Sequence, residues 1–285
     1  PLHAASSGIV QPPETLPLPY PGSGMGHCLV IETDGQDTAM TRSPGQYDAS
    51  DRDKILHAIE SAGIVGLGGA GFPSATKLRT ATDHGIHTLI VNGVECEPLA
   101  SCDKTLLTHF PGDVLEGATL LCQAFRIRTC VLAIGADQRD VRTRLEERIR
   151  AGDYPLLSLV SVPPRYPAGG EKQLIQVITG REVPAQELPA DRGLVCLNVS
   201  TVASIYRALN TGEPLISRLI TVTGQGIRHP HNILARIGTP IAELIHQCGG
   251  YTPDATRLVM GGAMMGYPLS SDSLPVIKST HCIWL

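Results

Sequence analysis

Short apolar runs alternate with stretches of helical spacing along the middle of this chain, and this alternation restricts its fold more than any other feature. The apolar runs are 87–93, 129–135, 156–163 and 193–199, and the helical stretches are 114–125, 137–152, 170–180 and 201–212. Strands that are apolar almost throughout are typical of a sheet with helices on both faces. The pattern therefore predicts an α/β fold with a mostly parallel sheet.

The pattern of apolar and polar residues changes at both ends of this region. After Gly212, residues 218–227 alternate as a strand, 235–250 contain a helix, and 256–266 predict another strand. A β-α-β pattern of this size indicates a separate small domain. We place its bounds at 214–275, after an α/β domain at 49–213.

The first 48 residues are rich in Pro, Gly, Ser and Thr, and they predict a linker or a small β-structure with one strand over 27–34. Ser50 and Asp53 resemble a capping box that begins a helix, and Gly63 suits the position just after its end. Because the chain starts without Met and ends uncapped, we expect it to be part of a longer protein. Residues 276–285 would then be a linker to a further domain.

Composition excludes several classes of protein. The 285 residues carry a formal charge of −4 and no basic run, so general attraction to nucleic acid or anionic lipid is absent. The longest apolar stretches are too short to span a bilayer, and no signal peptide is present. These features predict a soluble protein, which can still dock onto a membrane complex.

The eight cysteines are scattered, and no C-x-x-C pair occurs among them. Cys122, Cys130 and Cys196 lie inside apolar segments, where a thiol behaves as a small buried hydrophobe. We predict free structural thiols in a reducing compartment and find no ligand set for an iron–sulfur cluster or another metal in this sequence.

The stretch GIVGLGGAGFPSATKL, residues 63–78, contains the densest glycine cluster of the chain. GLGGAG matches G-x-G-x-x-G, but the dinucleotide fingerprint needs a strand before it and a helix after it. Here a predicted helix precedes the glycines and Pro73 follows them. Two interpretations remain: a tight turn, or a bare backbone lying against a flat or phosphorylated ligand, with Phe72 and Lys77 beside it.

A second polar cluster, VNGVECEP, follows the first apolar run. Asn92, Glu95 and Glu97 come just past the expected carboxyl end of that strand, where open α/β sheets bind ligands. Their side chains could accept hydrogen bonds from ribityl or ribose hydroxyls or from a carboxamide. The alternative is a solvated turn before Pro98.

Two further clusters occupy corresponding positions. RYPAGGEKQL (165–174) places glycines before a helix whose free N–H groups could face an anion, with Glu171 and Lys172 on its first turn. LNVSTVAS (197–204) places Asn198 at a strand end and Ser200 or Thr201 at an N-cap, which can also be a plain cap. We expect all four clusters to converge at one edge of the sheet.

These motifs resemble one family in the same order. GLGGAGFPSATKL, VNGVECEP, YPAGGEKQL, TGREVP and LNVSTVASIYRA closely resemble the C subunit of the Rnf ion-translocating electron-transport complex, and more distantly the FMN- and NADH-binding subunit of respiratory complex I. RHPHNILARIGTP and MGGAMMGYPL extend the resemblance through the small domain, which is similar to a β-grasp-like (SLBB) module. The residues before 50 resemble the tail of an N-terminal β-sandwich.

The resemblance implies a Rossmann-like sheet with FMN bound at its strand ends, and hydride exchange between NADH and FMN without a catalytic acid or base. The implied FMN-binding residues are Gly66, Gly68, Gly69, Lys77, Asn92, Glu95, Gly169, Gly170, Glu171, Asn198 and Thr201. Phe72, Glu97 and Glu171 match positions that hold NAD(H).

Two departures concern the nucleotide contacts. The FMN-binding protein of complex I has an arginine where this chain has Leu67, and a glutamate where it has Gly170. The family also carries two [4Fe-4S] clusters, which we expect only in the full-length protein.

The resemblance further implies the other Rnf subunits as partners, including membrane subunits and a ferredoxin-like subunit, and ferredoxin indirectly. The expected location is peripheral, at the cytoplasmic side of the bacterial inner membrane. The alternatives are a corrin (cobalamin) reductase of the propanediol-utilisation type and a non-catalytic docking module.

Overall fold

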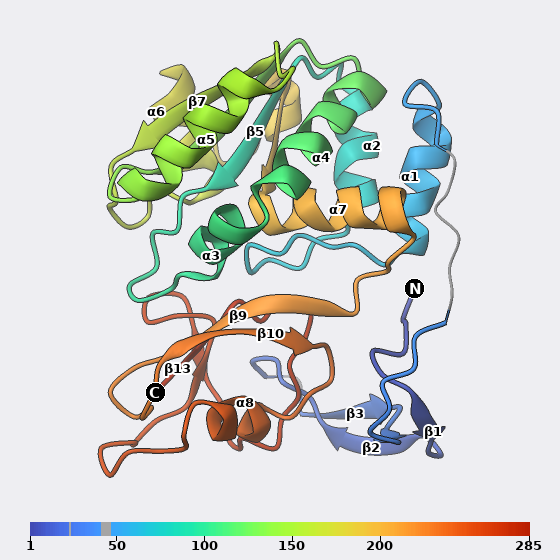
Figure 1. The fold of residues 1–285 in the computed structure, drawn as a ribbon, viewed down its shortest axis with the longest axis vertical. Helices are drawn as coiled ribbons and strands as arrows, with labels where there is room; N and C mark the ends of the chain where they lie inside the picture. Colours follow the sequence, from blue (N-terminus) through green and yellow to red (C-terminus); the bar gives the residue numbers. More distant parts are fainter. Residues whose placement is uncertain (23, 41–46) are drawn as a thin grey trace.

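The structure is a computed structural model that describes residues 1–22, 24–40 and 47–285. An α/β part (residues 52–211) lies above a smaller, β-rich part (residues 217–285) in Figure 1, and an N-terminal β segment lies beside the smaller part. Among the described residues, no helix is both long and apolar enough to cross a membrane.

Four strands of the α/β part form a single parallel sheet in the order β7-β6-β5-β8. The strands are β5 (Thr88–Gly93), β6 (Thr129–Gly135), β7 (Leu157–Val162) and β8 (Leu194–Asn198). The predicted mostly parallel α/β sheet is therefore confirmed. The carboxyl end of β5 points toward the smaller part (Figure 1), so this edge of the sheet faces the junction between the two parts.

Helices cover both faces of this sheet, as its apolar strands require. The helices are α1 (Arg52–Ser61), α2 (Ser74–Asp83), α3 (Cys102–His109), α4 (Pro111–Ala124), α5 (Arg139–Ala151), α6 (Glu171–Thr179) and α7 (Val199–Thr211), with a short 3₁₀ helix at Pro189–Arg192. On β5, Leu89 and Val91 pack in the cluster with the other helices, while Ile90 packs with α6 on the opposite face. This alternation follows from the pleat of the strand.

The predicted capping box of the first helix is wrong. The cap of α1 is Asp51, whose carboxylate accepts from the backbone N–H of Lys54 at 3.2 Å, and Ser50 lies one residue too early to form the predicted capping box. Pro73 does not prevent a helix after the glycines, since it stands at the N-cap of α2, where a missing N–H costs nothing. Gly63 follows the end of α1 with φ +67°, as predicted.

The smaller part is a five-stranded sheet in the order β10-β9-β13-β11-β12, packed against one helix (Figure 1). Its elements are β9 (Ser217–Thr223), β10 (His231–Arg236), α8 (Ile241–Gln247), β11 (Val259–Met260), β12 (Tyr267–Pro268) and β13 (Cys282–Trp284). The strand predicted over 256–266 ends at Met260, because Gly261 and Gly262 turn the chain with φ of +113° and +140°.

The boundary that we predict after residue 275 is also wrong. Strand β13 pairs in parallel with β9 and antiparallel with β11, so it lies inside the second sheet. Ile283 is fully buried there. The residues from 276 to 285 are therefore part of the small sheet and not a linker.

The N-terminal segment contains β1 (Gly8–Val10) paired with β4 (Ile31–Thr33), and β2 (Glu14–Pro17) paired with β3 (Met25–Cys28). The single strand predicted over 27–34 is thus divided, because its two halves pair with different partners. Residues 23 and 41–46 of the predicted 1–48 segment lie outside the described residues.

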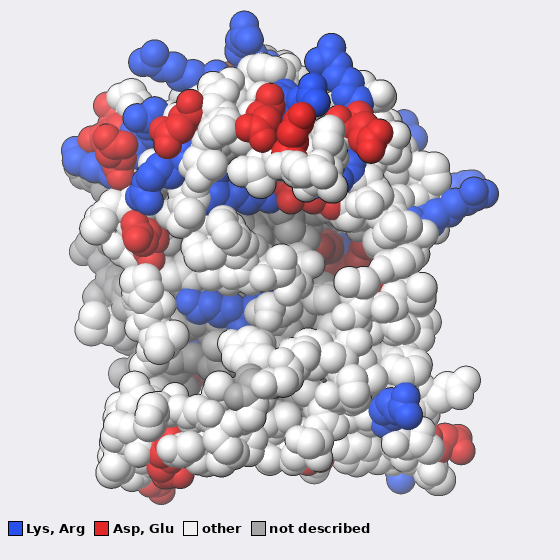
Figure 2. All heavy atoms as spheres, turned by 180° about the vertical axis from the view of Figure 1, so that it is seen from behind, with Lys and Arg blue, Asp and Glu red and all other residues white. Residues whose placement is uncertain are grey.

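Charged side chains gather over the α/β part on the face opposite to that of Figure 1. On the same face, the surface of the smaller part of the molecule is mostly uncharged (Figure 2). The surface is hollowed near the junction of the two parts.

The crossing of α4 and α7 provides a test of the core. A Cβ added to Gly117 would lie 2.7 Å from the carbonyl oxygen of Val202, whereas one added to Gly112 on the same helix would meet nothing closer than 3.6 Å. We expect Gly117→Ala to lower the free energy of unfolding by about 1–3 kcal/mol, because the helices must move apart. Gly112→Ala, the matched control, should change it by less than about 1 kcal/mol. Equal effects in urea unfolding would contradict this packing.

Candidate functional site

All four polar clusters lie together at the carboxyl edge of the parallel sheet. The side-chain amide of Asn92 donates to the carbonyl of Gly169 at 2.9 Å, which joins the second and third clusters. The backbone N–H of Leu67 donates to Oγ1 of Thr201 at 2.9 Å, which joins the first and fourth. The expected convergence is therefore present in the structure.

The glycine loop, residues 66–71, is a closed turn. The N–H of Gly66 donates to the carbonyl of Phe72 at 2.7 Å, and the N–H of Gly71 donates to the carbonyl of Gly66 at 3.0 Å. Gly69 has φ +107°, and a Cβ there would lie 3.4 Å from Cε1 of His281. A Cβ on Gly68 would lie 3.4 Å from Cβ of Asn198. The loop therefore presents bare backbone close to two other segments.

The first turn of α6 faces α2 across the site. Nζ of Lys77 lies 2.5 Å from Oε1 of Glu171, and both side chains are only half-buried. Gly170 is the N-cap of α6 and, having no side chain, makes no side-chain cap hydrogen bond to the helix. A Cβ on Gly169 would lie 2.4 Å from the carbonyl oxygen of Val94, so only glycine lets this segment approach the end of β5.

Glu95, which the resemblance implies as an FMN-binding residue, is engaged by the protein itself. Its two carboxylate oxygens accept from the backbone N–H groups of Asp103 and Lys104, at 3.1 and 3.0 Å, and so cap helix α3. Burial, followed by the charge of Asp103, raises the pKa of Glu95 to about 7.

Asn198 is likewise occupied by the protein itself. Its amide donates to Asp103 at 2.5 Å, and its oxygen accepts from the N–H of Ser200 at 2.8 Å as the N-cap of α7. The hydroxyl of Ser200 also donates to Asp103, at 2.8 Å. Burial raises the pKa of Asp103, and these hydrogen bonds oppose the rise. This network fixes the loops and leaves few free hydrogen-bonding groups.

Glu97 connects the two parts of the molecule. Its carboxylate oxygens accept from the N–H groups of Met264 and Met265, both at 2.9 Å, in the loop between β11 and β12. The backbone at Gly262 comes so close that a Cβ there would lie 2.8 Å from the same carboxylate. Phe72, in contrast, is 52% exposed and free to stack on a ligand.

Arg218 and His281 of the smaller part reach the glycine loop, and the sequence pattern did not single them out. Buried Arg218 of β9 donates to the carbonyl of Leu67 at 2.9 Å. His281 lies against Gly69, and burial, together with the charge of Arg218, lowers the pKa of His281 to about 4. Arg218 is the one charged residue of β9, and this is the only signal in the sequence that could have drawn attention to it.

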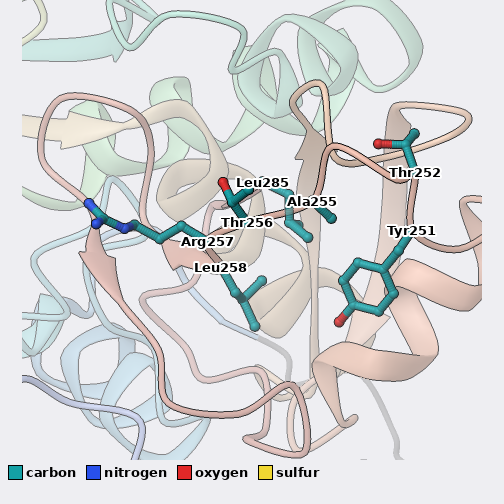
Figure 3. A pocket seen from close by; sticks show the side chains of 7 residues that line it. All are labelled: Tyr251, Thr252, Ala255, Thr256, Arg257, Leu258 and Leu285. Atoms are coloured by element: carbon teal, nitrogen blue, oxygen red, sulfur yellow. The ribbon is translucent and has the colours of Figure 1, made fainter.

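Two cavities lie away from this site. The larger, about 340 Å³, is open and belongs to the smaller part (Figure 3); its lining residues are Tyr251, Thr252, Ala255, Thr256, Arg257, Leu258 and Leu285. The other, about 120 Å³, lies beside Cys122, Cys130 and Tyr154. Neither is lined by a predicted site residue. The cysteines are free thiols, and the described residues contain no group of three or more metal-ligating side chains.

Comparison with known families defines the class of this protein. Residues 59–207 match the model of the family described as the Nuo51 FMN-binding domain, and residues 219–268 match that of the SLBB domain. The first match covers more than half of the chain, which therefore belongs to the Nuo51 FMN-binding domain family.

Similar individual proteins are named as the C subunit of an ion-translocating oxidoreductase complex, which confirms the resemblance to the Rnf protein. The protein of Pseudomonas aeruginosa is 41% identical over 283 residues, covering 99% of this chain and 36% of the relative. That of Rhodobacter capsulatus is 37% identical over 283 residues, covering 99% and 54%. The chain therefore spans only 36% and 54% of these relatives.

The fold also occurs in solved structures. A crystal structure of an NAD⁺-reducing [NiFe]-hydrogenase in the H₂-reduced state has a TM-score of 0.66 and 26% identity, over 82% of this chain and 47% of the other. The air-oxidised state gives a TM-score of 0.67 at 24% identity, over 82% and 47%, and shows the fold alone.

The raised pKa of Glu95 predicts a pH dependence of stability. Folded Glu95 keeps its proton up to about pH 7, whereas the unfolded residue releases it near its ordinary value of 4.5. The folded state therefore binds more protons in this window, and its stability falls as the pH rises from about 4.5 to 7.

Glu95→Gln removes this loss. We compare the free energies of unfolding of the variant and the native chain by urea unfolding. Their difference should shift in favour of the variant by on the order of 1–3 kcal/mol as the pH rises from 4.5 to 7. Glu60→Gln on the surface is the control for replacing a carboxylate with an amide. A stability difference for Glu95→Gln that stays constant with pH would contradict the assignment.

Proposed function

We propose that this chain is the FMN- and NAD(H)-binding part of the C subunit of an ion-translocating oxidoreductase complex, where it exchanges hydride between NADH and FMN. One observation carries the proposal: a bare-backbone loop lies at the carboxyl edge of a parallel sheet in a chain of the Nuo51 FMN-binding domain family. Ligands bind at this edge in open α/β sheets.

The residues present fit a flat, phosphorylated cofactor. Gly68 and Gly69 carry no side chain where a Cβ would take up space beside Asn198 and His281, so backbone can lie directly against a ring. Lys77 is a half-buried cation that can meet a phosphate, and the uncapped N-terminus of α6 offers free N–H groups to the same charge. FMN, when bound, supplies the hydride-accepting chemistry.

The polar residues of the site have two kinds of role in this proposal. Lys77 and Glu171, which pair with each other at 2.5 Å, remain partly exposed and are available to a ligand. Glu95, Asn198 and Thr201 hold the loops in position through their own hydrogen bonds, and their contribution to FMN binding is positional. Asn92 acts in the same way by holding Gly169.

Of the residues expected to bind NAD(H), one is exposed and one is engaged by the protein itself. Half-exposed Phe72 can stack on a nicotinamide or adenine ring. Glu97 can serve a nucleotide only after it releases the N–H groups of Met264 and Met265. Nucleotide entry would therefore be coupled to movement of the loop between β11 and β12.

The rest of the electron pathway is proposed to lie outside this chain. Two [4Fe-4S] clusters would be held by other residues of the full-length protein, since the described residues provide no cluster ligands. The other proteins of the complex would bind the assembled subunit at the cytoplasmic face of the membrane.

A glycine substitution tests the FMN site. We expect Gly69→Val to weaken FMN binding at least tenfold, because the added side chain takes the space of the ring or ribityl chain and strains a residue with φ +107°. Gly85→Val is the matched control, since Gly85 also has positive φ (+71°) but a Cβ there meets nothing within 4 Å. Flavin fluorescence quenching and the shift of the flavin absorption band measure binding. Native affinity in the Gly69 variant would mean that the loop is only a turn.

The hydride step has its own test. Adding NADH without oxygen to the FMN-loaded chain should bleach the flavin absorption near its visible maximum, because hydride transfer removes the oxidised chromophore. FMN binding without bleaching would favour a docking role and overturn the NADH part of the proposal. NADPH serves as the comparison for nucleotide specificity.

A further inference from the structure

Arg218 enters the α/β part from the smaller part. It stands on β9, is 3% exposed, and its guanidinium donates from Nη2 to the carbonyl of Leu67 at 2.9 Å and from Nη1 to the carbonyl of Lys278 at 2.5 Å. Burying a guanidinium is costly unless it is hydrogen-bonded. Its position is therefore fixed by these two carbonyls, one in each part of the molecule, and by a longer bond from Nε to the carbonyl of Leu219 at 3.4 Å.

The contact with Leu67 completes a clamp on the glycine loop. Thr201 accepts from the N–H of Leu67, while Arg218 donates to its carbonyl oxygen. These two bonds fix the peptide planes on both sides of Leu67, the second of which includes the N–H of Gly68. Nζ of Lys278 donates to the carbonyl of Gly63 at 2.6 Å, so the smaller part also holds the start of this segment.

A glycine-rich segment needs such support. Glycine has the largest conformational freedom of all residues, so a loop with positive φ at Gly69 and Gly71 does not hold one shape by itself. The side chain of Leu67 is 1% exposed and packs into the core, which fixes one point only. The hydrogen bonds from Leu67 to Thr201 and from Arg218 to Leu67 determine how the following glycines are oriented.

The clamp also places the positive charge of Arg218 next to the glycine loop. Arginine remains protonated in proteins, and a charge buried in a low-dielectric environment acts over longer distances than one in water. Backbone carbonyls accept these hydrogen bonds of Arg218, so the contacts with Leu67 and Lys278 orient the guanidinium. The carboxylate of Asp103 interacts with the same charge and balances part of it. Position 67 itself carries no charge, since Leu67 stands there.

We propose that Arg218 is a positioning residue of the flavin site: the smaller part sets the shape of the glycine loop through the hydrogen bond from Arg218 to Leu67. This inference rests on the proposed function. In it, the smaller part is needed for cofactor affinity although it does not contain the sheet edge on which the cofactor lies.

Substitution of Arg218 tests the inference. Arg218→Met keeps the length and apolar character of the stem but removes the donors and the charge. We expect the Kd for FMN to rise at least tenfold and the backbone amides of residues 67–71 to exchange at least tenfold faster in the absence of FMN. Arg218→Lys keeps the charge and can reach only one of the two carbonyls, so it should give an intermediate rise in Kd, about two- to tenfold.

Arg228 provides the matched control. It is a second arginine of the smaller part that donates to a backbone carbonyl, that of Tyr251 at 3.0 Å, but it does not contact the glycine loop. Arg228→Met and Arg228→Lys should leave the Kd for FMN within twofold of the native value. A general loss of stability would then be separated from a specific loss of loop geometry.

The outcomes are distinct. Folded Arg218→Met with native Kd and native exchange of residues 67–71 overturns the inference, as does a variant that only unfolds at lower urea while binding FMN normally. If Arg218→Met does not fold, the same two measurements on Arg218→Lys decide. If the native chain binds no FMN, the proposed function fails, and the exchange of residues 67–71 still shows whether Arg218 holds the loop.

Discussion

A half-buried carboxylate, that of Asp103, joins the segments on which the candidate site is built. It accepts hydrogen bonds from Asn198 at the end of β8 and from Ser200 at the start of α7, while its own N–H is held by Glu95 beyond the end of β5. These partners offset the cost of removing part of this carboxylate from water. Strands β5 and β8 and helices α3 and α7 therefore keep fixed relative positions, and Thr201 of α7 supports the glycine loop on that frame.

The second constraint is the junction between the two parts. The carboxyl edge of the sheet faces the smaller part (Figure 1), and polar groups cross the junction in both directions. Arg218 and Lys278 reach toward the glycine segment, and Glu97 reaches toward the loop between β11 and β12. The site is thus enclosed by two folding units, and its shape depends on both.

Much of the architecture could be predicted from local pattern. The strands β5, β6 and β8 are apolar almost throughout. The glycines and polar residues of the four clusters lie next in sequence to the elements that place them. The last strand of the smaller part was harder to predict, because β13 is defined by pairing with β9, about sixty residues earlier in the chain, and not by its own composition. The same holds for the divided strand at 27–34, whose halves have different partners.

The sequence by itself determined the class of fold and the four segments that converge at the strand ends, because hydrophobic period and glycine content are local properties. Only the tertiary structure decided what the polar residues do there. Nothing in the sequence distinguishes Glu95, Glu97 and Asn198 from one another as ligand-binding residues. In the folded chain each forms hydrogen bonds with a backbone or side-chain group that folding brings close. Arg218 lies 151 residues from Leu67 along the chain, and no local pattern encodes a contact over that separation.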